Sequence, residues 1–192
     1  MDIVEYNPFK PFIPTQSNKL IIGNFPIGKF TNPDRFHEKK KHELDFYYGG
    51  ENNKLWRLLG AVFNEELNTV AKIKSFLKAH HLGIADILLS CCRINGSALD
   101  TALYQKTYNH ELKNIIEENN FNELLFTSRH VYTEFRKNIG KFPEIKHTIL
   151  ISPSPNAIRG LVKNKEFLAL KSKTPKLTAE EFRLMKYKQV FS

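Results

Sequence analysis

The chain has 192 residues, of which 41% are hydrophobic, and this size and composition are typical of one globular domain with a sizeable core. No apolar run is long enough to cross a membrane, and the first residues lack the features of a signal peptide, so we expect a cytoplasmic protein. The formal net charge of +9 favours an anionic partner, most often nucleic acid. Two adjacent cysteines cannot hold an iron–sulfur cluster and the histidines lack metal-ligand spacing, so no metal and no cofactor is expected.

The first third of the chain predicts an arm, a strand, a loop and a helix. Residues 1–18 contain three prolines and no hydrophobic period, which favours an extended N-terminal arm. A short apolar run at 19–25, closed by a proline, predicts a buried strand, and the polar stretch 27–45 predicts a long loop. Apolar residues with helical spacing then predict a helix at 53–63.

The middle of the chain gives alternating helix and strand signals. Residues 69–80 have the apolar spacing of a helix, and 84–90 form a second apolar run that is typical of a buried strand. The sequence Ser97-Ala98-Leu99-Asp100 resembles a capping box and predicts the start of a short helix. A further helix is expected at 109–119.

The last third repeats this alternation and ends in a helix. Strands are predicted at 123–128 and 147–152, with a helix at 130–139 between them and a C-terminal helix at 178–191. Short apolar strands that alternate with helices indicate an α/β protein. We therefore predict a single domain over residues 1–192, a three-layer α/β/α sandwich with a central, mostly parallel four-stranded sheet.

Two tyrosines, two glycines and two asparagines precede the helix predicted at 53–63. Gly49 and Gly50 permit a backbone path with positive φ, and an asparagine at a helix start is a favoured cap. Such a turn can present a flat ligand to the ring of Tyr48 and the carboxamide of Asn53. The alternative is a capped helix after a turn, with both tyrosines half buried.

Segments that are polar, tight or both follow three predicted strands and should meet at the carboxyl edge of the sheet, where ligands of such folds bind. They are Asn24-Phe25-Pro26, Ser90-Cys91-Cys92-Arg93 and Ser152-Pro153-Ser154-Pro155-Asn156. Because side chains alternate along a strand, Asn24 is expected to point away from the face that Phe25 occupies. Asp86 lies within an apolar run, so we expect it to be buried, hydrogen-bonded and structural.

Four motifs occur in order between residues 19 and 160. They are Gly23-Asn24-Phe25-Pro26; Tyr47-Tyr48-Gly49 with Asn53 and Trp56; Asp86-Ile87 with Ser90-Cys91, Gly96-Ser97 and Asp100; and Ser152-Pro153-Ser154-Pro155-Asn156-Ala157. Their order and spacing resemble the uracil-DNA glycosylase superfamily, and most closely its mismatch-specific and hypoxanthine-DNA glycosylase branches. The resemblance implies a DNA repair enzyme that hydrolyses the N-glycosidic bond of a deaminated or mispaired base, of the uracil or hypoxanthine type, in DNA.

The resemblance also implies roles for individual residues. Asn53 would hold the attacking water, because a carboxamide has one acceptor and two donors; alternatively, it only caps the following helix. The flipped base would stack on Tyr48, with Phe25 as a second wall and Ser90 at its polar edge. The simpler alternatives are a core tyrosine and a serine that merely ends a strand.

The segment after the last predicted strand would grip the phosphate backbone of DNA. Its two prolines make it stiff, and Ser152, Ser154 and Asn156 can contact phosphate. Arg159, Lys163 and Lys165 would add further contacts to the DNA backbone, unless they belong to an ordinary solvated basic face.

One departure from the pattern leaves other functions open. Residues 49–53 read Gly-Gly-Glu-Asn-Asn, where the branch that the chain resembles usually has Gly-His-Pro-Arg-Asn. The alternatives to a DNA glycosylase are a nucleic-acid-binding protein of the same fold without catalysis, and an N-ribosyl hydrolase that acts on free nucleosides. The sequence indicates neither the excised base nor the oligomeric state.

Overall fold

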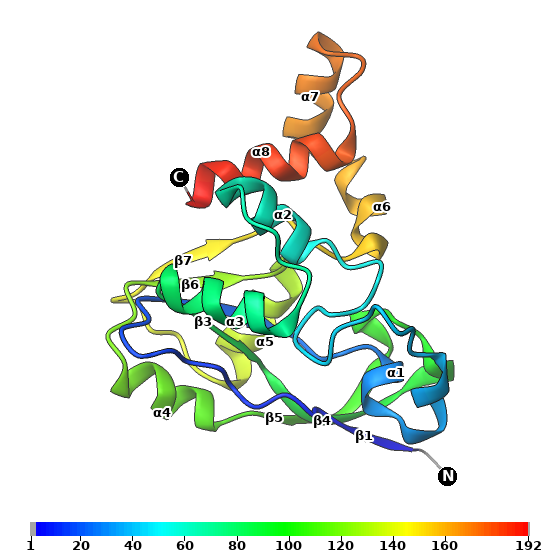
Figure 1. Ribbon diagram of the computed structural model, residues 1–192, viewed down its shortest axis with the longest axis vertical. Helices are drawn as coiled ribbons and strands as arrows, with labels where there is room; N and C mark the ends of the chain where they lie inside the picture. The colour runs from blue at the N-terminus through cyan, green and yellow to red at the C-terminus, as the bar shows by residue number, and fades with distance from the viewer. Residues whose placement is uncertain (1–2, 192) are drawn as a thin grey trace.

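A parallel four-stranded sheet forms the centre of the computed structural model, which describes residues 3–191 (Figure 1). Its strands lie in the order β3-β2-β6-β7, and all three pairings are parallel. Their bounds are Lys19–Gly23 for β2, Leu82–Asp86 for β3, Glu123–Phe126 for β6 and Lys146–Ile149 for β7.

Eight α-helices are described within residues 3–191. Helices α4 and α5 cover one face of the sheet, and α2, α3 and α8 cover the other. Their bounds are α1 Gly28–Thr31, α2 Leu55–Phe63, α3 Val70–Ala79, α4 Glu111–Glu118, α5 Arg129–Asn138, α6 Ile158–Leu161, α7 Lys165–Lys173 and α8 Ala179–Phe191. None of these helices, in the part of the chain from 3 to 191, combines the length and apolar character needed to cross a bilayer.

Alternating side chains of the sheet divide the core into two halves. Leu20 and Ile22 of β2 pack in a cluster with residues of α4 and α5, whereas Ile21 packs with residues of α2, α3 and α8. This is the alternation expected of a strand that is covered on both faces. The predicted α/β/α architecture with a central parallel sheet is therefore confirmed.

The single strand predicted at 84–90 is wrong, because two strands of different sheets occupy this run. β3 ends at Asp86, and β4 (Leu88–Arg93) joins an antiparallel sheet in the order β1-β4-β5. The junction is Ile87, whose N–H donates to the carbonyl of Gly23 at 3.0 Å while its own carbonyl accepts from Asn109 at 2.8 Å. An uninterrupted apolar run gives the same signal for one strand and for two strands in succession.

The N-terminal segment packs onto the sheets as an extended chain. Strand β1 (Val4–Tyr6) pairs with β4, and Phe12 forms a bridge with Ile84. Residues 1 and 2 of the predicted arm lie outside the described residues.

Further differences from the sequence predictions are helices α6 and α7, which were not predicted, and several short elements. The stretch 27–45, predicted as a loop, contains α1 and a 3-10 helix at Pro33–Glu38. The predicted capping box is wrong, since the Ser97 hydroxyl accepts from the N–H of Leu99 and a 3-10 helix begins only at Asp100. Strand β5 (Leu103–Tyr108) was not predicted, because polar residues interrupt its hydrophobic pattern.

Candidate functional site

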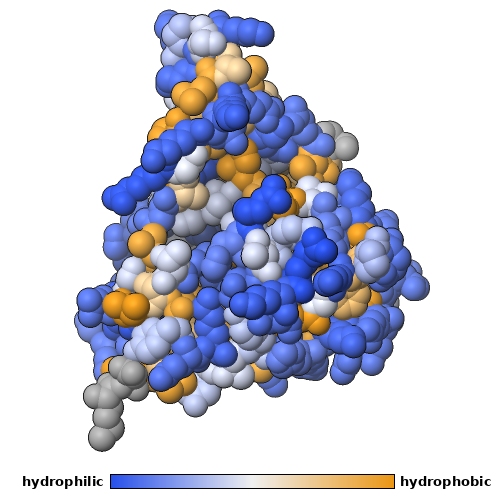
Figure 2. Space-filling model, turned by 180° about the vertical axis from the view of Figure 1, so that it is seen from behind, coloured by the Kyte–Doolittle hydropathy of each residue, from blue (hydrophilic) through white to orange (hydrophobic). Residues whose placement is uncertain are grey.

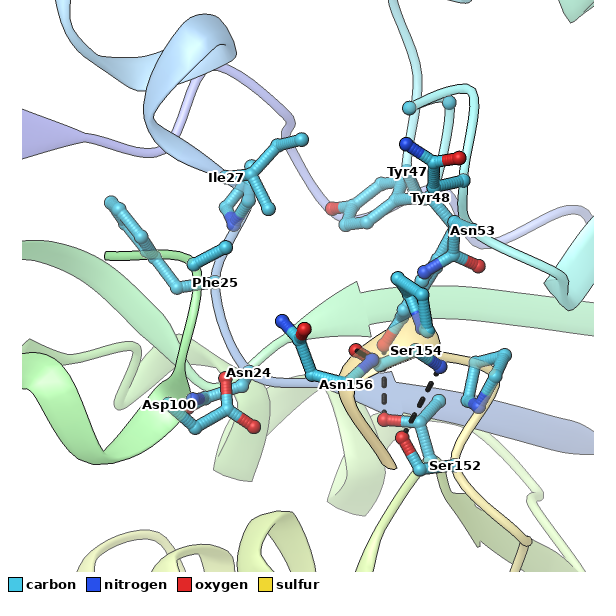
Figure 3. Close-up of a pocket in the computed structure, with 18 of the residues that line it drawn as sticks. Asn24, Phe25, Ile27, Tyr47, Tyr48, Asn53, Asp100, Ser152, Ser154 and Asn156 are labelled. Atoms are coloured by element: carbon cyan, nitrogen blue, oxygen red, sulfur yellow. Dashed lines mark hydrogen bonds between the residues drawn. The ribbon is translucent and has the colours of Figure 1, made fainter. Parts of the chain in front are cut away.

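A cavity of about 570 Å³ lies at the carboxyl edge of the parallel sheet. Segments that follow β2, β6 and β7, the last residue of β3 and the loop before α2 contribute to its lining. These are residues 24–27, 127–128, 152–157, 86 and 46–53, with 98–101 as a further wall. The volume is typical of small-molecule sites. In the close-up, Asn24, Phe25, Ile27 and Asp100 lie on one side and Tyr47, Tyr48 and Asn53 on the other (Figure 3).

The half-buried ring of Tyr48 forms part of the cavity wall, on the same side as Asn53. Its hydroxyl donates to Oγ1 of Thr127 at 3.0 Å, and that hydroxyl donates in turn to the carbonyl of Ile22 at 3.1 Å. Burial, followed by the nearby Asp86 carboxylate, raises the pKa of Tyr48 well above its usual value. Tyr48 is therefore a neutral donor whose ring is fixed against the sheet.

The neighbouring Tyr47 belongs to the core, with 1% of its surface exposed. Its carbonyl accepts the indole N–H of Trp56 at 2.7 Å, and its hydroxyl donates to the carbonyl of Phe9 at 3.1 Å. Only one of the two adjacent tyrosines is thus half buried.

The turn after the tyrosines differs from the predicted one. The positive φ, 56°, belongs to Tyr48 and not to Gly49 or Gly50. Glycine is needed at 49 for another reason, because a Cβ there would overlap the carbonyl oxygen of Leu44. The glycine therefore provides a close backbone approach and not a left-handed conformation.

Asn53 both supports helix α2 and lines the cavity. Its Oδ1 accepts the N–H of Leu55, the first residue of α2, at 2.9 Å. The neighbouring asparagine, Asn52, is exposed to solvent. One lone pair of Oδ1 and the amide group of Asn53 have no partner among residues 3–191, so the carboxamide can contact a ligand.

The loop 152–157 is held by its own serines and by α8. The Ser152 hydroxyl accepts from the N–H of Ser154, and the Ser154 hydroxyl accepts from the N–H of Asn156, both at 3.3 Å (Figure 3). The buried guanidinium of Arg183 donates to the carbonyl of Ser154 at 3.1 Å. These bonds restrain the loop at the cavity.

Asp86 is the site residue that the sequence reasoning assigned only a structural role. It is the last residue of β3, it is buried, and its Oδ2 accepts from Nδ2 of Asn7 at 3.1 Å, but it also lines the cavity. A Cβ on Gly23 would overlap both Asp86 Oδ1 and the Tyr48 hydroxyl, so glycine at 23 leaves room for them. Burial raises the pKa of Asp86 to about 7; the charge of Asp100 adds to the rise and the bond from Asn7 opposes it. The available signal was an aspartate at the carboxyl end of a buried strand.

Asn24 also lies in the wall, although it was expected to point away from Phe25. Both residues line the cavity, because β2 ends at Gly23 and strand alternation ends with it. The side-chain oxygen and nitrogen of Asn24 are buried and have no hydrogen-bond partner among residues 3–191. A buried carboxamide without a hydrogen-bond partner costs free energy. Such a group in the wall of a cavity is suited to bind a polar ligand.

A buried ion pair fixes two walls of the cavity. The guanidinium of Arg93 contacts the Glu5 carboxylate at 3.0 Å, and both side chains are 3% exposed. The same guanidinium donates to the carbonyls of Pro26 at 2.7 Å and Ser97 at 2.8 Å. Residues of the N-terminal segment thus hold the loops that follow β2 and β4.

Four residues predicted for the site lie outside the cavity. Ser90 is buried in β4, where it is aligned with Tyr6 and Thr107, because the run 84–90 enters the second sheet. Arg159, Lys163 and Lys165 are exposed in and after α6 and do not line the cavity. Within residues 3–191, no group of three or more His, Cys, Asp or Glu side chains is arranged to hold a metal ion.

No protein-family model matches the chain, and no curated protein matches it. Among solved structures, the chain is similar to the solution NMR structure of a "putative Uracil DNA glycosylase from Methanosarcina acetivorans". The TM-score is 0.62 at 17% sequence identity, over 98% of this chain and 99% of that chain. The chain has a uracil-DNA-glycosylase-like fold. At this identity the likeness concerns the fold alone, and the cavity lies where such a parallel sheet places ligands.

Proposed function

We propose that this protein is a DNA glycosylase that hydrolyses the N-glycosidic bond of a deaminated or mispaired base of the uracil or hypoxanthine type. The observation that carries the proposal is the cavity at the carboxyl edge of the sheet, in which the ring of Tyr48 and the carboxamide of Asn53 share one wall. The similar solved structure, that of a "putative Uracil DNA glycosylase", supports the same class of reaction.

The cavity would receive a base that has been flipped out of the duplex. Its volume of about 570 Å³ accommodates a purine or a pyrimidine, and the rings of Tyr48 and Phe25 supply apolar surfaces for stacking. The unpaired carboxamide of Asn24 and the carboxyl group of Asp86 would meet the polar edge of the base in place of Ser90.

Bond cleavage requires a positioned water and stabilisation of the departing base. The carboxamide of Asn53 would hold the water beneath the sugar. In the transition state of the cleavage, the sugar resembles an oxocarbenium ion. Negative charge grows on the base as the bond breaks, and a hydrogen-bond donor stabilises it. Asp86, with its pKa raised to about 7, is partly protonated at neutral pH and would donate to a carbonyl oxygen of the base.

The loop 152–157 would grip the strand that carries the flipped nucleotide. Asn156 and the backbone of this stiff loop would contact phosphate, with Ser152 and Ser154 maintaining its conformation. Arg159 and Lys163, which follow this loop in the chain, would supply further positive charge to the DNA.

The test is a panel of duplexes that carry uracil, hypoxanthine, xanthine or mismatched thymine, with alkali used to reveal abasic sites. Cleavage of at least one modified duplex, and none of the undamaged duplex, is expected. Tight binding without cleavage would instead indicate a DNA-binding protein, and hydrolysis of free nucleosides alone would indicate an N-ribosyl hydrolase.

A further inference from the structure

Positive charge is concentrated in one short part of the chain. Residues 158–177 contain six lysines or arginines and one glutamate, a net charge of +5, whereas the whole chain carries +9. All six basic side chains are exposed, and none forms an ion pair with an acidic residue among residues 3–191; they are Arg159, Lys163, Lys165, Lys171, Lys173 and Lys176. The glutamate, Glu166, pairs with Lys186 of α8 at 3.0 Å.

This segment, which we call the basic arm (residues 158–177), projects from the molecule beside the cavity. It begins where the cavity loop ends, at Ala157, and α7 stands out beyond α8 (Figure 1). Hydrophilic side chains cover much of the projection, next to a line of apolar ones (Figure 2). The nine residues of α7 are about 13 Å long, which corresponds to about four base pairs of duplex.

The basic arm is braced against the element that also holds the cavity loop. The rings of Phe167 in α7 and Phe182 in α8 pack with centroids 5.3 Å apart. The next residue of α8, Arg183, donates to the carbonyl of Ser154 in the loop. The arm and the cavity loop are thus both fastened to the first half of α8, so the charges of the arm are held in place relative to the cavity.

We infer that the basic arm is a second DNA-binding surface, which contacts phosphates of the duplex several base pairs from the nucleotide in the cavity. The inference rests on the proposed function, because that function names DNA as the ligand. No acidic side chain forms an ion pair with these six basic residues within residues 3–191, so they remain available to phosphate, and each phosphate that they neutralise releases counterions. The arm lengthens the bound stretch of DNA and contributes no residue to the cavity.

The experiment compares two triple variants of equal net charge. In the arm variant, glutamate replaces each of Lys165, Lys173 and Lys176. In the control variant, glutamate replaces three exposed lysines near the C-terminal ends of α3 and α5, at the opposite edge of the sheet; these are Lys78, Lys137 and Lys141. Affinity is measured for undamaged duplexes of about 10 to 30 base pairs at several salt concentrations. A matched variant with glutamine at the three arm positions shows whether loss of charge suffices.

We expect the arm variant to lose tenfold or more in affinity on the long duplexes and much less on the shortest. The slope of log K against log salt should fall by about 2–3, since each phosphate contact contributes about 0.9. The glutamine variant should show the same pattern more weakly, and the control variant should change little at any length. Equal losses in the arm and control variants, or equal losses at all lengths, would overturn the inference.

The outcome also separates this inference from the proposed function. A parent protein that binds duplexes through the arm but cleaves none would contradict the glycosylase proposal and support the arm. If the parent cleaves modified duplexes but the arm variant binds DNA as well as the control variant does, the glycosylase proposal is supported and the inference about the basic arm is contradicted. A parent that binds no duplex would contradict both.

Discussion

The backbone N–H of Lys54 donates a hydrogen bond to the carbonyl oxygen of Pro153 at 3.1 Å. The two residues are far apart in sequence, and each lies next to a proposed functional group. Lys54 follows Asn53, and Pro153 lies in the loop 152–157. The residue proposed to hold the water and the loop proposed to grip DNA are therefore joined through the backbone, so we expect a change in the loop to affect both binding and cleavage.

Replacing Pro153 and Pro155 together with glycine tests this connection. The variant keeps the carbonyl that Lys54 contacts but loses the fixed φ at two positions. We expect the free energy of unfolding to fall by about 1–2 kcal/mol, while duplex affinity and the single-turnover cleavage rate both decrease. The exposed Pro143→Gly is the control, with unchanged binding. A folded double variant with the affinity and cleavage rate of the parent would show that the loop does not grip DNA.

The two roles of Asn53 are separable by a pair of substitutions. Asn53→Ala should lower the cleavage rate about ten- to a thousandfold with little change in DNA affinity, and should also destabilise α2 by about 0.5–2 kcal/mol. Asn53→Ser retains an oxygen that can accept the N–H of Leu55, so its melting temperature should stay near that of the parent while cleavage is still slow. Rapid cleavage by the serine variant would refute a role for the carboxamide in holding water.

Tyr48 should contribute through its ring more than through its hydroxyl. Tyr48→Ala is expected to weaken capture of a flipped base by about 1–3 kcal/mol, measured as the affinity for a modified duplex relative to an undamaged one. Tyr48→Phe keeps the ring and loses the bond to Thr127, so its main effect should be on stability. If the alanine variant binds both duplexes equally less well, Tyr48 supports the fold instead.

Asp86 should make stability depend on pH in a defined direction. Its pKa is raised from 3.8 to about 7, so between these values the folded state binds the proton more tightly than the unfolded state does. The contribution of Asp86 to stability therefore falls as pH rises through this window. Relative to the parent, Asp86→Asn should gain up to about 3 kcal/mol between pH 5 and pH 8 in urea unfolding. A difference that stays constant over that range would mean that Asp86 titrates normally.

Binding to undamaged duplex should weaken steeply as the salt concentration rises. The net charge of +9 favours contacts with phosphates, and each such contact releases counterions. The measurement is log K against log salt for the parent protein. A nearly flat dependence would remove the argument from charge, including the one for the basic arm.

The elements that the sequence predicted well are those whose signal lies in neighbouring residues. Helix α3, for example, begins after Thr69, whose hydroxyl accepts the N–H of Lys72, within one residue of the predicted start. Local pattern could not show that Ile87 belongs to neither sheet, because this depends on its bonds to Gly23 and Asn109.

The same limit applies to the candidate site. Tyr47 and Tyr48 are adjacent and chemically equal, and contacts with distant residues, such as the bond of the Tyr47 hydroxyl to the carbonyl of Phe9, place Tyr47 in the core. The carboxyl group of Asp86 reaches the cavity because Gly23, on the neighbouring strand, has no side chain. Such relationships between distant residues do not appear in the spacing of any one segment.

The position of β2 has a consequence for how the protein is made. It is the first strand of the parallel sheet along the chain, yet it lies inside the sheet, with Lys19 aligned to both Leu82 and Glu123. Pairings between such distant residues form slowly, so β2 waits for its neighbours during synthesis. The last wall of the cavity ends at Ala157. A nascent chain that stops before residue 152 would already contain most of its hydrophobic residues and Asn53, yet it would lack the cavity wall that residues 152–157 form.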